Sequence, residues 1–77
     1  MPRLPALKPK EVIKILESAG FYLVHKKGSH FKFKDISGNT TIIPLHNKDI
    51  KKGLLERIIK DTGLTLREFL NLRRRKK

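Results

Sequence analysis

The first hydrophobic pattern along the chain has the period of an α-helix. Four hydrophobic side chains in the segment 10–19 are spaced i, i+3, i+4 and i+7: Val12, Ile15, Leu16 and Ala19. This spacing places them on one face of a helix. Pro9 suits the first turn of that helix, and Gly20 suits its end. We therefore predict an amphipathic helix over 10–19 whose apolar face packs against another layer.

The next part of the chain has the pattern of β-strands. Three segments are rich in branched and aromatic residues: 21–26, 30–35 and 40–45. The segment 30–35 alternates between apolar and polar residues, which is typical of a half-buried strand. Turn sequences at 27–29 and 37–39 separate the three segments, and Pro44 suits the end of a strand. We predict three consecutive antiparallel strands.

Two more helices are predicted after the strands. The segment 53–61 carries four hydrophobic residues on one side: Leu54, Leu55, Ile58 and Ile59. Gly63 is suited to end this helix. Thr65 and Glu68 have the spacing of a capping box, which predicts a short last helix over 66–72.

This order of elements predicts an α+β fold of one domain, residues 1–72, followed by a basic C-terminal tail, residues 73–77. A chain of 77 residues buries only about 60% of its unfolded surface, which suffices for one core between two layers. We expect both long helices to cover one face of a three-stranded antiparallel sheet, and the other face to be open to solvent.

The composition indicates which kinds of partner the protein binds and in which compartment it resides. The chain has 19 Lys and Arg against 7 Asp and Glu, a net charge of +12, and it lacks Cys. Such a charge favours polyanions, nucleic acid before an anionic membrane surface. Disulfides and thiolate metal sites are excluded, and no stretch resembles a signal peptide or a membrane span. We therefore expect a cytoplasmic protein, monomeric when free and without membrane association.

The predicted strand 30–35 divides its side chains between two faces. Phe31 and Phe33 point to one side, and His30, Lys32 and Lys34 point to the other. We expect the phenylalanines to face the helices, so that His30 heads a row of lysines on the open face. Lys26 and Lys27 are expected close by, just across the turn.

In this arrangement His30 could act on RNA in either of two ways. A histidine with the ordinary pKa of about 6.5 is mostly neutral near pH 7, so His30 could remove the proton of a 2′-hydroxyl during metal-free cleavage. Alternatively, His30 is a surface residue that merely contacts phosphate.

Gly28 and Ser29 could present backbone N–H groups to a phosphate. His46 is a second polar group that could approach His30, and the general acid is a lysine, His46 or water. No metal site is expected, because no histidine pair or carboxylate cluster has suitable spacing.

The sequence resembles the HicA family of small toxins, which act as mRNA interferases in HicA–HicB toxin–antitoxin pairs. The resemblance follows a set of short motifs in family order: 12–16, 20–21, 26–30, 43–46, 50–53, 63–64 and 68–70. It implies a fold similar to double-stranded-RNA-binding domains, cleavage of mRNA without a cofactor, and a single catalytic histidine, carried here by His30. It also implies a HicB-like antitoxin that covers the active face.

Two other classes remain open from the residues alone. A non-catalytic module could bind structured RNA by shape and phosphate contacts, through Lys26, Lys27, Gly28, Ser29, Lys32 and Lys34. A DNA-binding partner of a regulator is the third class, although no helix-turn-helix spacing is present. The RNA-binding module and the ribonuclease differ in the role of His30, which is catalytic only in the ribonuclease.

Overall fold

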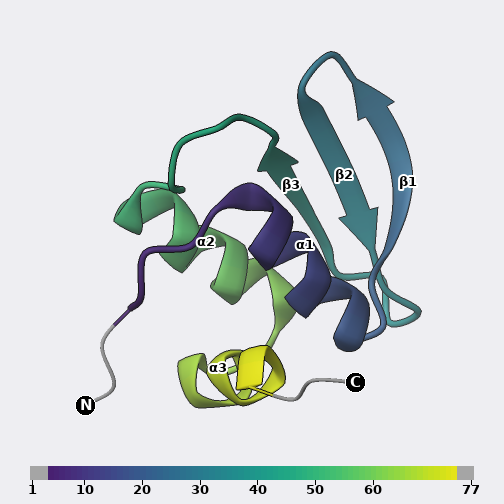
Figure 1. The fold of residues 1–77 in the computed structure, drawn as a ribbon. Coiled ribbons are helices and arrows are strands. Elements are labelled where there is room, and N and C mark those ends of the chain that lie inside the picture. Colours follow the sequence, from purple (N-terminus) through teal and green to yellow (C-terminus); the bar gives the residue numbers. More distant parts are fainter. Residues whose placement is uncertain (1–3, 75–77) are drawn as a thin grey trace.

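A computed structural model describes residues 4–74 and has the predicted α+β architecture (Figure 1). The elements follow in the order α1 (Pro9–Ser18), β1 (Tyr22–Lys27), β2 (His30–Lys34), β3 (Thr40–Pro44), α2 (Lys52–Thr62) and α3 (Leu66–Arg74). The predicted three-stranded antiparallel sheet and the three helices are thus confirmed.

The sheet has the order β1-β2-β3, so β2 is its central strand. Phe33 of β2 lies opposite Thr41 of β3, and Phe31 lies opposite Ile43. Because directly opposite residues share a face, these four side chains form the inner face of the sheet. Phe33, Thr41 and Ile43 are buried there, whereas Phe31 is only partly buried.

The core lies between this inner face and the helices. The predicted stripe of α1 is buried at Val12, Ile15 and Leu16. Both α1 and α2 pack against β3, and the hydroxyl of Thr41 donates a hydrogen bond to Asp61 of α2 over 3.4 Å. The core therefore centres on β3 and its two helices.

The N-terminal lead-in contributes to this core, which the sequence pattern did not indicate. Leu7 is fully buried, and its carbonyl accepts a hydrogen bond of 2.8 Å from the backbone N–H of Ile50. The segment before α1 is thereby held against the loop before α2.

The last helix begins with the predicted capping box. The N–H of Thr65 donates to a carboxylate oxygen of Glu68 over 2.9 Å, and the N–H of Glu68 donates to the Thr65 hydroxyl over 3.1 Å. Phe69 anchors α3 in the core with no exposed surface. The helix continues to Arg74, so the first two residues of the predicted tail are helical, and 75–77 lie outside the described residues.

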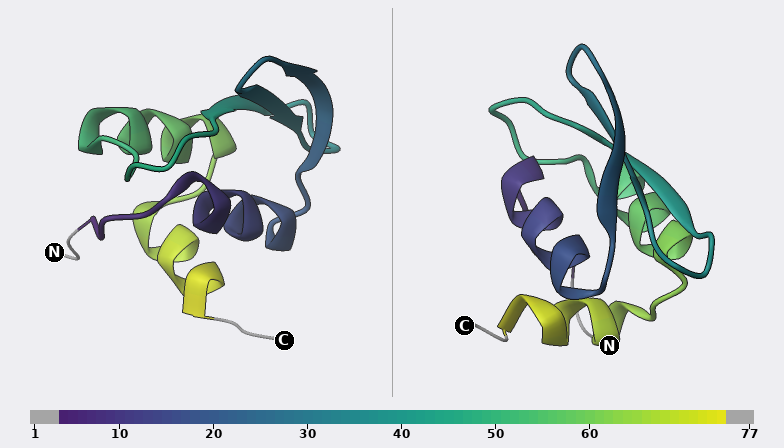
Figure 2. Two further views of the ribbon diagram at one scale, coloured as in Figure 1. Left: turned by 45° about the horizontal axis from the view of Figure 1, so that its top comes forward. Right: turned by 90° about the vertical axis from the view of Figure 1, so that its right-hand side faces the viewer.

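The helices cover less of the sheet than expected. Every residue of β1 is exposed, including Leu23 and Val24, and the β1–β2 hairpin extends beyond the helices (Figures 1 and 2). The reason is that α1 packs against α3 as well as β3, at the end of the molecule opposite the hairpin tip. The helices thus lie on one face of the sheet, as predicted, but they pack chiefly against β3 and leave β1 exposed.

The short turn between β2 and β3 is stabilised by hydrogen bonds to the carboxylate of Asp35. The side chain and the backbone N–H of Asn39 donate hydrogen bonds of 3.0 and 2.8 Å to Asp35. These bonds, the side-chain bond foremost, favour the charged carboxylate and hold the pKa of Asp35 below its ordinary value.

We predict that Phe33→Ala lowers the free energy of unfolding by about 3–5 kcal/mol, because it leaves a cavity in the core. Phe31→Ala should cost roughly half as much, since part of that ring is already in water. Lys32→Ala, on the other face, should change stability little. Urea unfolding followed by circular dichroism measures all three, and a larger loss for Lys32→Ala would reverse the assignment of faces.

We predict that Asn39→Ala raises the pKa of Asp35 toward its ordinary value. A carboxylate with a lowered folded-state pKa stabilises the fold above its unfolded pKa, and this stability is lost as the pH falls through the folded pKa. The variant should therefore be less stable than the parent at neutral pH, and the difference should shrink in acid. Carboxyl NMR titration and urea unfolding test this, with exposed Asn71→Ala as the control.

Candidate functional site

The hairpin between β1 and β2 places His30 at its tip. Gly28 has a φ of +57°, and Ser29 has a negative φ, which is the sign pattern of a type II′ turn with glycine in its first central position. This two-residue turn sets Lys27 directly opposite His30. A glycine is required because other residues rarely adopt this φ.

The outer face of the sheet carries the predicted row of basic side chains. His30, Lys32 and Lys34 are all exposed, while Phe33 between them is buried. Lys27 continues the row across the turn. The alternation of β2 thus separates an apolar face from a basic one, as the sequence predicted.

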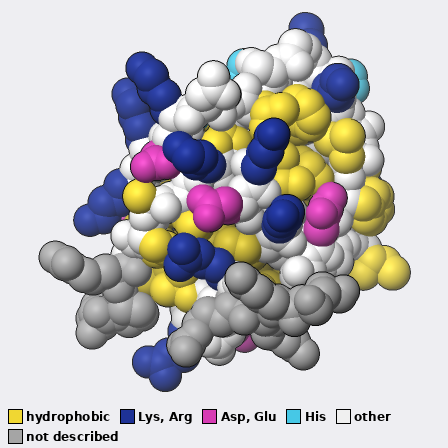
Figure 3. Space-filling view, in the orientation of Figure 1, with side chains coloured by type: hydrophobic (Ala, Val, Ile, Leu, Met, Phe, Trp, Pro, Cys, Tyr) yellow, Lys and Arg dark blue, Asp and Glu magenta, His cyan; other side chains and the backbone are white. Residues whose placement is uncertain are grey.

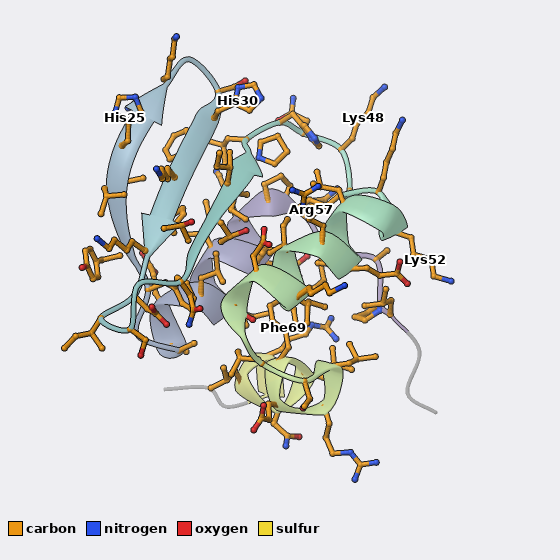
Figure 4. The ribbon with its side chains drawn as sticks, turned by 180° about the vertical axis from the view of Figure 1, so that it is seen from behind. His25, His30, Lys48, Lys52, Arg57 and Phe69 are labelled. Atoms are coloured by element: carbon orange, nitrogen blue, oxygen red, sulfur yellow. The ribbon has the colours of Figure 1, made fainter. Side chains whose placement is uncertain are left out.

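A β-bulge at Val24 changes which residues of β1 share the face of His30. The pairing passes from Leu23 opposite Phe33 to His25 opposite Lys32, which leaves Val24 as the extra residue. The bulge thereby puts Tyr22 on the outer face opposite Lys34, whereas His25 lies on that face because of the two-residue turn. Figure 4 shows His25 at the same end of the hairpin as His30.

The two-residue turn places Lys26 on the inner face. Lys26 lies opposite Phe31, and its Nζ stands 5.4 Å from the centre of the Phe31 ring in a cation–π contact. Figure 3 shows the side of the molecule that carries α1, where hydrophobic side chains are exposed over the hairpin among basic ones. Lys26 thus lies just across the turn from His30, as expected, but on the inner face of the sheet, and its contact with RNA stays a prediction.

His46 lies beyond the end of β3. Pro44, two residues earlier, is the residue opposite His30, and the N–H of Leu45 donates a hydrogen bond of 2.6 Å to the carbonyl of Ser29. The segment with His46 is thus attached to the turn that carries His30. The Nδ1 atom of His46 accepts a hydrogen bond of 3.2 Å from the N–H of Lys48.

Three exposed lysines around the start of α2 extend the basic surface: Lys48, Lys51 and Lys52. Figure 4 shows Lys48 and Lys52 on the α2 side of the molecule, away from His30. No sequence motif marks this group, and acidic residues nearly balance the basic ones in the segment 35–72. Among the side chains that the structure describes, the one salt bridge joins Lys8 to Asp49 at 3.3 Å, so the basic groups on the sheet and at α2 are unneutralised.

Residues 4–74 contain neither a metal-binding cluster nor a membrane-spanning helix. No group of three or more His, Asp or Glu side chains in this part of the chain is arranged to hold a metal ion. None of its helices has the length and apolar character that crossing a bilayer requires.

The family model described as the HicA toxin of bacterial toxin–antitoxin systems matches residues 9–64, well over half of the chain. The chain belongs to the HicA toxin family. The matched span begins at α1 and includes the whole sheet, the Gly28-Ser29-His30 turn and α2. A comparison with curated proteins finds no match.

Membership in the HicA family assigns the chain to the toxin side of a toxin–antitoxin pair, with an antitoxin as its partner. The matched span ends at Leu64, so α3 lies beyond it. The HicA match thus covers both the basic outer face and the core that supports it, whereas α3 completes the core through Phe69.

We predict that Gly28→Ala destabilises the chain by about 1–2 kcal/mol, because the alanine must adopt a left-handed φ. A Cβ at this position would meet no atom within 4 Å, so the cost comes from the backbone alone. The same substitution at Gly53, which is helical and equally open, should instead stabilise by up to about 1 kcal/mol. Urea unfolding of the two variants in parallel measures both changes in the free energy of unfolding. Equal changes for Gly28→Ala and Gly53→Ala would contradict the turn assignment.

Proposed function

We propose that this HicA-family toxin is an endoribonuclease that cleaves mRNA in the cytoplasm and thereby inhibits translation, as a stress response would require. The observation that carries the proposal is the position of His30, an exposed imidazole at a hairpin tip beside unneutralised lysines, within the span matched by the family.

In the proposed reaction, His30 acts as general base. It removes the proton of a 2′-hydroxyl, and the oxygen attacks the adjacent phosphorus while the bond to the 5′-oxygen breaks. The products are a 2′,3′-cyclic phosphate and a 5′-hydroxyl, so no water molecule is consumed in this step, and the proposed reaction uses no metal ion. The leaving oxygen takes its proton from a lysine, from His46 or from water.

The neighbouring groups bind the RNA backbone in this proposal. Lys27, Lys32 and Lys34 are exposed on the face of His30 and can contact phosphates along one strand. Charge that develops on the phosphoryl oxygens is stabilised by the nearest ammonium groups. The open turn at Gly28 and Ser29 lets backbone N–H groups approach a phosphate.

The antitoxin partner is proposed to be HicB-like and to present an acidic surface to this basic face. Such complementarity accelerates encounter and selects the partner. The net charge of +12 also makes association of two copies through their basic faces unfavourable.

One observation favours the non-catalytic alternative. Among the described residues, no side-chain hydrogen bond orients the imidazole of His30, whereas Nδ1 of His46 has a backbone donor. A general base is commonly held by a partner, although such contacts often tighten only when substrate binds. A module that binds structured RNA without cutting it is therefore the second candidate.

We predict that a defined RNA incubated with the chain in EDTA is cut to fragments with 2′,3′-cyclic phosphate ends. His30→Ala should lower the cleavage rate by roughly 10²–10⁴, the usual contribution of a general base. His25→Ala removes another exposed imidazole from the same face and is the matched control, which should retain cleavage. Gel analysis of labelled RNA measures the rates.

Two outcomes would contradict this proposal. RNA binding without cleavage by the unmodified chain would support the binding module. Full activity in His30→Ala would exclude His30 as the base, whichever residue then proved necessary. A filter-binding assay on all three proteins keeps loss of binding apart from loss of chemistry.

A further inference from the structure

A pocket of about 430 Å³ lies between the start of α1 and the segment that follows β3. Six residues line it: Lys8, Pro9, Lys10, Leu45, His46 and Asn47. In Figures 1 and 2 these two chain segments run close together. The volume falls within the range of small-ligand sites, and the hydrogen bond from Leu45 to Ser29 attaches its wall to the turn of His30.

The walls of this pocket combine apolar surface with one directed donor. Leu45 is partly buried and offers apolar contact, whereas Pro9 is fully buried and supports the wall from behind. Since Nδ1 of His46 accepts the N–H of Lys48, the neutral ring carries its proton on Nε2. The remaining ring nitrogen of His46 is therefore a hydrogen-bond donor, which suits the acceptor atoms on the edge of a nucleobase.

The two lysines of the pocket differ in their partners. Nζ of Lys8 lies 3.3 Å from the Asp49 carboxylate and 3.4 Å from the carbonyl of Asn47, so it ties the pocket wall together. Lys10 is exposed and makes no salt bridge with the side chains of the described residues. Its ammonium group is available to a phosphate at the rim.

We propose that this pocket binds one nucleotide of the RNA strand, next to the phosphodiester held at His30. The inference rests on the ribonuclease function proposed above. The base lies against Leu45 and accepts a hydrogen bond from Nε2 of His46, while Lys10 contacts a phosphate. Proteins that recognise single-stranded RNA commonly take up one unstacked base in this way, and the pocket would give the cut a base preference.

The experiment is an NMR titration of the full chain with each of the four ribonucleoside 5′-monophosphates. We expect saturable shifts of backbone amides concentrated at Lys10, His46 and Asn47. Lys10→Gln should weaken binding roughly threefold, as the loss of one exposed charge contact does. Lys14→Gln, an exposed position one turn further along the same helix, removes the same charge and should leave the affinity unchanged.

Inorganic phosphate at matched concentration separates recognition of a base from attraction of any anion. Equal shifts with phosphate alone, shifts spread over all lysines, or equal weakening by Lys10→Gln and Lys14→Gln would each overturn the proposal. Cleavage is scored separately. Cleavage that depends on His30 without nucleotide binding in the pocket would overturn the pocket alone, and saturable binding there without cleavage would overturn the ribonuclease alone.

Discussion

The burial of Phe33 is the constraint on which the arrangement of the surface depends. Its side chain is 3% exposed and lies opposite buried Thr41, which attaches β2 to β3 and the helix layer. Because strand side chains alternate, a shift of one residue would turn the whole strand over. Packing of one aromatic ring therefore decides that Lys32, Lys34 and His30 face solvent, although none of them contributes to the core.

Much of this arrangement could be predicted from sequence because period and capping are local properties. The stripe of α1, the alternation of β2 and the reciprocal bonds of Thr65 and Glu68 each depend on residues a few positions apart. The orientation of His30 followed from the same alternation. These features can be predicted from the sequence pattern alone, because they depend on no residue that is distant in the chain.

The features that could not be predicted depend on long-range packing. Val24 is a good strand residue, so nothing in its type indicates the bulge that places Leu23, rather than Val24, opposite Phe33. Leu7 stands between prolines without a periodic neighbour, and its burial requires the loop at Ile50. The pocket beside His46 likewise joins segments more than thirty residues apart. Such contacts are set by how the layers meet, which a single sequence does not encode locally.

The exposed outer strand β1 has a consequence for how the chain associates. Its free edge could accept a strand from another molecule, and Leu23 and Val24 are exposed hydrophobic residues beside it. The bulge at Val24 interrupts the regular spacing that an added strand would need, and Lys26 and Lys27 bring like charges together if two such edges approach. The irregularity at Val24 thereby protects the folded chain against edge-to-edge aggregation.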